Sequence, residues 1–446
     1  MIMDMIGRIG LLRHSSTKVK LSFRHTSSCL LRSLRTTNSD LYLLAFGFLF
    51  RLSLSPFSRD PWDMNVWQSI GSAILSGQNP YALTSNALIY PPLWGIFCTT
   101  SYLSYTLTNN PFISYFTLKL PIIIADISIS LIIKKIVYNR TLDVRKARTA
   151  MLLYLFNPVT IVISSLWGMF DAIPTLFALL SLLYLSQGKY LKSGLTLGVG
   201  IGFKGFFPAL LLPFFLFYIW KNEKRVSNCL RFSIYTALIP LVISMPFLII
   251  DSNTYISMIL FPVKRLPIHL TYWFSISELL KANAIPATTI IALSSIVSLS
   301  LFVTLYLFLI KKASVWPTKN NPGNMNFILK GTILVFFIFY LTSNTVNEQY
   351  LIWAIPFLIL YTKIYDQSLE LPFYSLIILD TLFLLLNVGP NFFAPIINMP
   401  SWWVSFQYSV PSMLLMILTG ILFSATCITV FLKLTKTVSS KLYNNQ

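Results

Sequence analysis

The sequence predicts an all-α polytopic protein that crosses a membrane about twelve times, within a range of roughly 10–13 helices. Of its 446 residues, 55% are hydrophobic and only 11% are charged, whereas a soluble domain carries roughly 25% charged residues. About 245 apolar residues would fill roughly twelve spans of about 20 residues each. This composition excludes a soluble globular enzyme, a fibrous protein and a disordered chain.

The apolar residues form continuous runs instead of alternating, which excludes an outer-membrane barrel. The predicted spans are 41–57, 113–138, 149–165, 171–186, 190–204, 206–220, 230–250, 286–310, 326–344, 350–364, 371–388 and 409–433. One more apolar run, 88–106, is expected to dip into the membrane and return.

The excess of basic residues is explained by topology. Lys+Arg is 34 and Asp+Glu is 14, a net charge of +20, which in a soluble protein would suggest nucleic acid. No RNA-binding or helix-turn-helix pattern is present, so no nucleic-acid partner is expected. With both termini inside and 88–106 not crossing, most cations fall on the cytoplasmic side, as membrane topology favours. We therefore expect a basic tail (1–40), a membrane domain (41–435) and a second tail (436–446).

The remaining charges gather on the outer side. Seven cations fall at or near the outer face, namely Arg51, Arg59, Lys119, Lys204, Lys264, Arg265 and Lys281. Six acids fall on outer loops or outer helix ends, namely Asp60, Asp63, Asp171, Asp251, Glu278 and Glu348. Charges held near or within a membrane usually line a cavity or pair with a partner. The pattern favours a reaction centre that faces outward.

Neither the cysteines nor the histidines form a metal-binding pattern. Cys29, Cys98, Cys229 and Cys427 contain no CxxC pair, and His14, His25 and His269 are equally scattered. No disulfide framework or zinc site follows from these spacings, so we expect no metal and no cofactor.

The sequence of the first outer loop, 58–112, predicts a helix that lies in the membrane interface. Apolar residues recur every four positions, at Trp62, Val66, Ile70 and Ile74, which gives a stripe on one helix face. Gly77 is expected to end this helix. Asp63 would lie near the helix N-terminus, where the dipole favours an ionised carboxylate that can accept a proton from a hydroxyl. Alternatively, Asp63 could simply cap the helix.

An ordered set of motifs resembles a known class. In chain order they are Asp63, Gly77–Tyr81, Tyr90–Leu93, Leu155–Pro158 with Ser164, Ser165, Gly168 and Asp171, Lys204 with Pro208, Arg265 with His269, and Glu348–Trp353. Together they resemble the GT-C class of membrane glycosyltransferases, and within it the first mannosyltransferase of glycosylphosphatidylinositol synthesis and its prokaryotic relatives. The family often has D-x-D in the first loop, whereas here Pro61 follows Asp60.

The resemblance implies a GT-C-type helical bundle that transfers a hexose, mannose in these relatives, with inversion. The donor would be a polyprenyl or dolichyl phosphate sugar and the acceptor a lipid- or protein-linked glycan, on the outer or lumenal face. It implies that Asp63, with Asp60 second, acts as the base. The implied substrate-binding residues are Asp171, Lys204, Lys264, Arg265, His269, Glu348, Gln349 and Tyr90. Membrane lipids and an accessory membrane subunit are the implied partners. The protein would lie in a prokaryotic plasma membrane, the reading we favour, or in the endoplasmic reticulum of a eukaryote.

Several residues also have structural interpretations. Asp60 could pair with Arg59 at a wet surface, Asp171 could close a polar turn, and Lys204 could pair with an acid. Lys264 and Arg265 could anchor lipid headgroups.

Asp126 and Asp380 lie inside predicted spans, and a buried structural network is expected for both. The alternatives at the level of function are a secondary transporter or lipid flippase and a non-catalytic subunit of a glycosylation complex.

Overall fold

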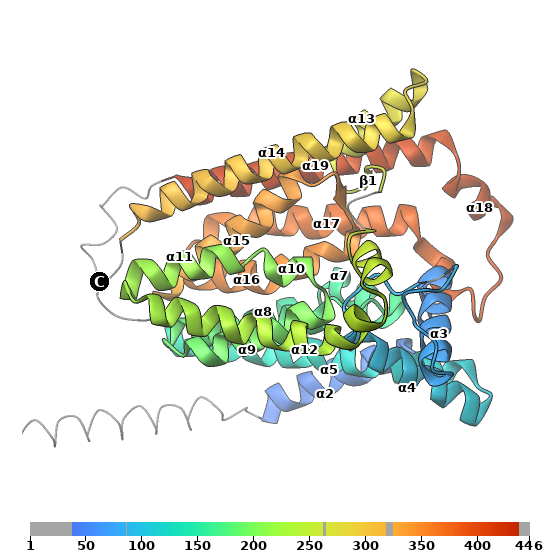
Figure 1. The fold of residues 1–446 in the computed structure, drawn as a ribbon, viewed down its shortest axis with the longest axis horizontal. Helices are drawn as coiled ribbons and strands as arrows, with labels where there is room; N and C mark the ends of the chain where they lie inside the picture. The colour runs from blue at the N-terminus through green and yellow to red at the C-terminus, as the bar shows by residue number, and fades with distance from the viewer. Residues whose placement is uncertain (1–37, 86, 262–264, 318–323, 437–446) are drawn as a thin grey trace, which may run out of the picture.

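The chain folds into a bundle of roughly aligned helices, as Figure 1 shows. The computed structural model describes residues 38–85, 87–261, 265–317 and 324–436. The predicted tails lie largely outside these ranges. In chain order the elements are α2 (Asn38–Leu54), α3 (Pro61–Leu75), α4 (Leu93–Thr108), α5 (Pro111–Thr141), α6 (Val144–Leu155), α7 (Pro158–Ile161), the π-helix η1 (Val162–Trp167), α8 (Ala172–Ser186), α9 (Tyr190–Phe203), α10 (Phe206–Ala209), α11 (Leu212–Glu223), α12 (Val226–Ile259), β1 (Ile268–His269), α13 (Tyr272–Ala282), α14 (Ala287–Ser314), α15 (Met325–Thr342), β2 (Thr345–Val346), η3 (Glu348–Tyr350), α16 (Leu351–Ile364), η4 (Gln367–Leu369), α17 (Glu370–Asn387), η5 (Gly389–Phe393), α18 (Ser401–Gln407) and α19 (Val410–Thr435).

The predicted all-α class is confirmed, since the two strands of the described chain are only two residues long each. Six described helical segments are long and apolar enough to cross a membrane, and a seventh is obtained if the bent segment from α6 to η1 counts as one span. Most predicted runs match single observed helices closely, as for α9 and α16. The runs 149–165 and 206–220 are exceptions, because each is broken, the first between α6 and α7 and the second between α10 and α11. Twelve crossings stay a prediction, because several of the remaining helices are short.

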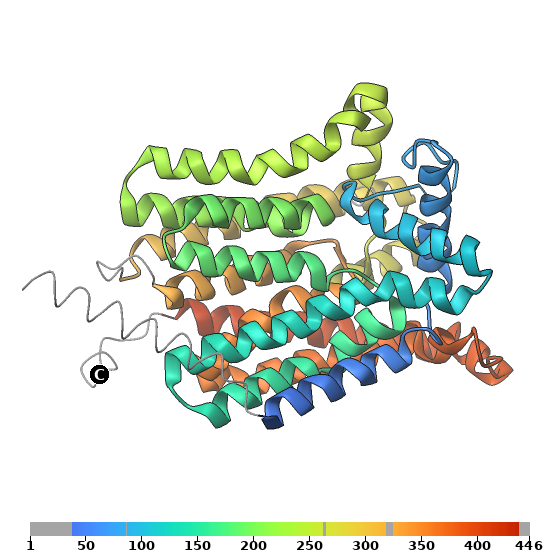
Figure 2. The same cartoon turned by 90° about the horizontal axis from the view of Figure 1, so that it is seen from below.

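The two ends of the bundle differ in structure. Helices α3, α4, α13 and α18 gather at one end, which we call the α3 end (Figures 1 and 2). The turns that join α5 to α6, α8 to α9, and α11 to α12 lie at the opposite end (Figure 2). Helix α4 packs on α3 and stays at the α3 end. The apolar run 88–106, for which we expect a path into the membrane and back, therefore lies beside α3, the helix of the first outer loop.

The segment from α6 to η1 is broken in the middle. The Asn157 side chain caps α7 by accepting the Val159 N–H, and the segments before and after the break meet at 44°. The segment then continues as the π-helix η1. Gly168, whose φ is +93°, follows the last residue of this helix. π-Helical turns are rare and occur frequently at functional sites.

A buried ion pair lies beside this break and contacts its backbone carbonyls. Both side chains, Arg51 of α2 and Asp126 of α5, are 0% exposed, and their charged atoms lie 2.9 Å apart. The same guanidinium donates to the carbonyls of Leu155 and Thr160 at 2.9 and 3.1 Å. The Tyr154 hydroxyl donates to Asp126 at 2.9 Å. Asp126 thus belongs to a buried network, as expected, and the carbonyls of Leu155 and Thr160 have a donor. The same expectation for Asp380 is wrong: this side chain of α17 is 0% exposed, and neither of its carboxylate oxygens has a hydrogen-bond partner among the described residues.

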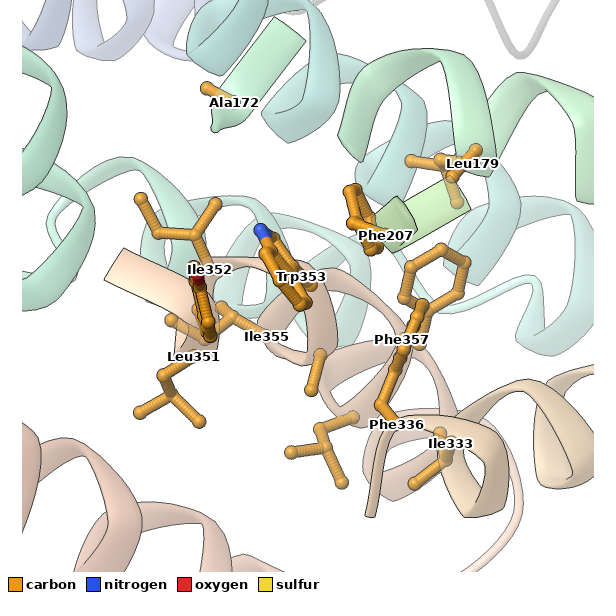
Figure 3. Packing of buried hydrophobic residues seen from close by; sticks show 14 of the residues in the cluster. Ala172, Leu179, Phe207, Ile333, Phe336, Leu351, Ile352, Trp353, Ile355 and Phe357 are labelled. Atoms are coloured by element: carbon orange, nitrogen blue, oxygen red, sulfur yellow. The ribbon is translucent and has the colours of Figure 1, made fainter. Parts of the chain in front are cut away.

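Aromatic rings pack the centre of the bundle between α10, α15 and α16. Trp353 stacks on Phe207 with a centroid distance of 4.3 Å and an interplanar angle of 14°, and Phe336 lies next to Phe207 (Figure 3). All three side chains are fully buried. This packing fixes the first turn of α16.

Replacing Arg51 by Met is expected to lower the free energy of unfolding by about 3–5 kcal/mol, because it leaves the Asp126 carboxylate buried without its cation. The measurement is the apparent unfolding midpoint of the protein in detergent. The double variant Arg51→Met, Asp126→Leu should recover part of the loss and not all of it, since the carbonyls of Leu155 and Thr160 still lack a donor. A single variant as stable as the parent would contradict the role given to the pair.

Candidate active site

Asp60, not Asp63, caps the outer-loop helix. The Asp60 carboxylate accepts the N–H groups of Trp62 and Asp63 at 3.0 and 2.8 Å, the arrangement typical of a helix N-cap. The alternative interpretation of Asp63 as a cap is therefore wrong. Asp63 stands in the first turn, where the helix dipole favours its ionised form.

The Asp63 side chain contacts the end of the π-helix. The Trp167 indole N–H donates to Asp63 Oδ2 at 2.7 Å, and the Asp60 backbone N–H lies 3.4 Å from the Trp167 carbonyl. These two contacts join residues that are about a hundred positions apart in the sequence. They fix where the Asp63 carboxylate points.

The predicted apolar stripe of this helix is only partly correct. Trp62 is 73% exposed, whereas Met64, Trp67 and Ile70 are 0–2% exposed. The face that packs on the bundle is therefore rotated from the predicted one. Steps of four residues overshoot one helical turn of 3.6 residues, so a stripe drawn through them drifts around the helix.

The surroundings of Asp63 raise its pKa to about 7. Burial is the largest cause, and the nearby Asp60 carboxylate adds to it; the hydrogen bond from Trp167 and the charges of Lys204 and Arg265 act in the opposite direction. Burial likewise raises the pKa of Asp60. A carboxylate with a pKa near neutrality is suited to accept a proton at physiological pH.

Lys204 forms a buried ion pair with Asp171. The ammonium lies 2.7 and 2.9 Å from the two carboxylate oxygens, and both side chains are essentially unexposed. The Trp353 indole N–H donates to Asp171 Oδ1 at 2.6 Å. The structural alternative considered for Lys204, pairing with an acid, is what the structure contains. Asp171 is 0% exposed with both oxygens engaged, so it is poorly placed to bind sugar hydroxyls.

Four aromatic rings surround the Lys204 ammonium. Its nitrogen lies 5.1–5.6 Å from the ring centroids of Tyr90, Phe170, Tyr350 and Trp353. Each ring face attracts a cation, and the attraction grows when water is excluded. One carboxylate and four rings explain how a lysine is accommodated among apolar residues.

Tyr90 and Arg265 connect this pair to Asp63. The charges of Asp63, Asp171 and Arg265 all act on the Tyr90 hydroxyl, and the charge of Arg265 also acts on Lys204. The Tyr81 hydroxyl donates to the Tyr90 carbonyl at 2.8 Å, which links the two sequence motifs that contain these tyrosines. Arg265 is half-buried and stacks over a neighbouring phenylalanine.

A second pair, His269 and Glu348, flanks the cluster. His269 Nδ1 lies 3.3 Å from the fully buried Glu348 carboxylate, and the imidazole is 26% exposed. Asn387 also donates to Glu348. Burial raises the pKa of Glu348, but the nearby His269 and hydrogen bonds, including the one from Asn387, lower it below its usual value. The pairing of β1 with β2 holds the two residues together.

The predicted site residues largely converge at the α3 end. The charges of Asp60 and Glu348 interact, which relates the His269–Glu348 pair to the residue that caps α3. Gln349 is 1% exposed beside Glu348. Lys264 lies outside the described residues. Lys281 pairs with Glu278 on α13 at 2.7 Å. The described residues thus gather Asp60, Asp63, Tyr90, Asp171, Lys204, Arg265, His269, Glu348 and Gln349.

Sequence reasoning missed the aromatic residues that hold the charged ones. Trp167, Phe170, Tyr350 and Trp353 all lie inside the motifs used above. Their positions close to Asp171 or Glu348 in the sequence could have marked them as residues of the site. Periodicity could not separate these rings from ordinary apolar packing.

The structure also contains two cavities away from this cluster. One of about 320 Å³ is lined by residues of α6, α7 and α17, and another of about 390 Å³ lies by the turn after α16. Neither contains a residue of the cluster. Among the described residues, no group of three or more His, Cys, Asp or Glu side chains is placed to hold a metal ion.

Comparisons with known proteins give distant structural likeness. No protein-family model matches the sequence, and no curated protein matches it. The solved structures include ArnT from Cupriavidus metallidurans bound to undecaprenyl phosphate, with 13% identity, a TM-score of 0.48 and coverage of 90% of this chain and 77% of that chain. ArnT from the same organism in the apo state has 14% identity, a TM-score of 0.48, and coverage of 89% and 76%.

Asp63 should titrate near pH 7. The measurement is coupling of an amine to Asp63 by a carbodiimide, which requires the protonated carboxyl. Coupling is quantified by mass spectrometry across pH against a small carboxylic acid as internal standard. Replacing Trp167 by Phe removes a hydrogen bond to the ionised form, so labelling should persist to higher pH in that variant. A midpoint near pH 4 in the parent protein would contradict the environment described for Asp63.

Proposed function

We propose that this protein is a GT-C-type membrane glycosyltransferase that uses a polyprenyl-phosphate sugar donor. The observation that carries the proposal is the cluster at the α3 end, where a carboxylate of pKa about 7 interacts electrostatically with Lys204 and Arg265. A proton acceptor beside cations is what transfer from a sugar phosphate requires. The ordered motifs of the sequence support the same class: all except Gly77–Tyr81 contribute residues to the cluster, and Tyr81 of that motif donates a hydrogen bond to the Tyr90 carbonyl.

In the proposed reaction, Asp63 takes the proton of an acceptor hydroxyl. The hydroxyl oxygen attacks the anomeric carbon from the face opposite the phosphate. The bond from that carbon to the phosphate oxygen breaks, and the polyprenyl phosphate leaves with the electron pair, so the anomeric configuration inverts. A phosphate is already a good leaving group, so no carboxylic acid is needed to protonate it. This differs from glycosidases, which use two carboxyl groups.

Arg265 is the best candidate for holding the donor phosphate. Its guanidinium is half-buried and has no carboxylate partner among the described residues, whereas Lys204 already has Asp171. Guanidinium groups bind phosphate through two parallel hydrogen bonds. Lys204 would contribute its charge at longer range and stabilise the phosphate as it leaves. His269 completes the proposed basic edge, and Lys264, which lies outside the described residues, stays a candidate for phosphate binding from the sequence alone.

Asp60, Tyr90, Glu348 and Gln349 are proposed to line the sugar subsite. Asp171 would act indirectly, by holding the Lys204 ammonium in place. Mannose is the proposed hexose and a lipid- or protein-linked glycan the proposed acceptor; both rest on the motif resemblance. An accessory membrane subunit is a further proposed partner.

The α3 end is proposed to face away from the cytoplasm. The turns at the opposite end are rich in Lys and Arg, which favour the cytoplasmic side. The donor tail would then lie among the helices and its phosphate near the outer headgroups. The proposed membrane is the plasma membrane of a prokaryote, or the endoplasmic reticulum of a eukaryote.

Replacing Asp63 by Asn should reduce sugar transfer by about 10²–10⁴-fold, because the variant removes the general base. The assay follows labelled mannose from a polyprenyl phosphate onto lipid extracts in vesicles that contain the purified protein. Asp143→Asn is the matched control: Asp143 caps α6 at the opposite end, and Asn caps equally well. An Asp63→Asn variant that is well inserted and fully active would remove the base assignment.

Replacing Arg265 by Gln should raise the KM for the donor by roughly 10-fold or more, since a hydrogen bond to a charged group contributes about 1.5–3 kcal/mol. Steady-state transfer at varied donor concentration provides the measurement. Lys281→Gln is the matched control, because Lys281 is also a cation of the α3 end but pairs with Glu278. Equal effects of the two substitutions would indicate a general surface-charge effect and not a phosphate site.

A further inference from the structure

Lys119 is a buried cation that the proposed reaction does not use. It lies on α5 and is 0% exposed. Its ammonium, with three N–H groups to donate, lies 3.0, 2.5, 3.0 and 2.8 Å from the carbonyl oxygens of Ser55, Ser58, Ser165 and Leu166. No carboxylate is among its partners in the described chain. A buried ammonium without an anion is costly unless other groups supply negative charge.

Two helix ends supply that charge. Ser165 and Leu166 belong to the last turn of η1, Ser55 directly follows the last residue of α2, and Ser58 lies in the loop beyond it. The last carbonyls of a helix lack intrahelical partners, and each helix C-terminus carries the equivalent of roughly half a negative charge. Two such ends facing one ammonium approximately balance it. Lys119 is therefore a shared C-terminal cap for two helical segments.

The two capped segments lead directly into the site. The turn after α2 continues into Asp60 and then Asp63, and η1 ends at Trp167. The segments also lie against each other: the Ser58 hydroxyl is 2.8 Å from the Leu54 carbonyl at the end of α2 and 3.3 Å from the Ser165 carbonyl of η1. The hydrogen bond from Trp167 to Asp63 spans the same two segments. The position of the Lys119 ammonium thus sets the distance between the two segments.

Gly168 leaves the room that Lys119 needs. Its φ is +93°, and a Cβ built there would lie 3.0 Å from Lys119 Cε. A side chain at this position would be strained by the backbone conformation and would also press on the lysine. The Trp-Gly sequence at the end of η1 is explained by both constraints.

We propose that Lys119 is a positioning residue for sugar transfer, which sets the distance between Asp63 and Trp167 by capping the two helix ends that carry them. This inference rests on the proposed function for its catalytic meaning. The part of the inference that concerns geometry, namely that Lys119 controls the surroundings of Asp63, does not depend on that function. Other ionisable groups whose charges act on Asp63 are Asp60, Lys204 and Arg265, with Tyr90 beside them.

The test compares Lys119→Met with Lys134→Met in the full-length protein. Lys134 lies on the same helix at the opposite end and pairs with Asp40 at 2.7 Å. Two quantities are measured for each variant: the pH midpoint of carbodiimide labelling at Asp63, and the rate of mannose transfer across pH. Gly168→Ala is the second variant, because it perturbs the same contact from the other side.

Lys119→Met should move the labelling midpoint of Asp63 to higher pH, because the Trp167 hydrogen bond to the ionised form is weakened. The acidic limb of the transfer profile should move in the same direction, with at least a 10-fold loss of kcat/KM at pH 7. Gly168→Ala should produce a smaller shift of the same sign. Lys134→Met should leave the midpoint unchanged.

An Asp63 midpoint that is the same in the parent and in folded Lys119→Met would overturn the positioning role. The same shift in Lys134→Met would overturn it as well, because the effect would then be general to α5. A labelling shift in Lys119→Met without mannose transfer by the parent protein would uphold the positional claim and refute the proposed function.

Discussion

Buried positive charge is the constraint on which the rest of this structure depends. In a bundle of mostly apolar helices a cation must have a local source of negative charge, and three fully buried cations find it in three different ways. Arg51 pairs with Asp126, Lys204 pairs with Asp171 inside a set of aromatic rings, and Lys119 is held by four backbone carbonyls. Each joins helices that are distant in sequence.

All three buried cations are connected to one segment, the broken run from α6 to η1. Arg51 satisfies the carbonyls at its break, Lys119 caps its last turn, and Asp171 follows directly after it. Trp167 at its end then donates to Asp63. A straight α-helix would have no free carbonyls in mid-bundle to offer Arg51. The irregular backbone is therefore what allows the charged groups to converge at the α3 end.

The sequence was sufficient to predict the helices and much of the residue cluster, because long apolar runs dictate spans and because ordered motifs marked Asp63, Lys204 and Glu348. It could not show which partner each charge selects. Whether Asp60 or Asp63 caps α3 depends on where that helix begins, a difference of a few residues. Lys119 stood out only as a cation near the outer face, since backbone carbonyls leave no trace in the side-chain pattern.

We propose that a carboxylate and a basic edge at the α3 end together form one site for a polyprenyl-phosphate sugar. The most direct measurement is a cryo-electron microscopy structure of the protein in lipid nanodiscs with a polyprenyl phosphate added. Density for the phosphate is expected against the Arg265 guanidinium, on the side of Asp63 and Tyr90, with the tail among the helices. A phosphate bound at the opposite end of the bundle, or separated from Asp63 by packed helices, would contradict it.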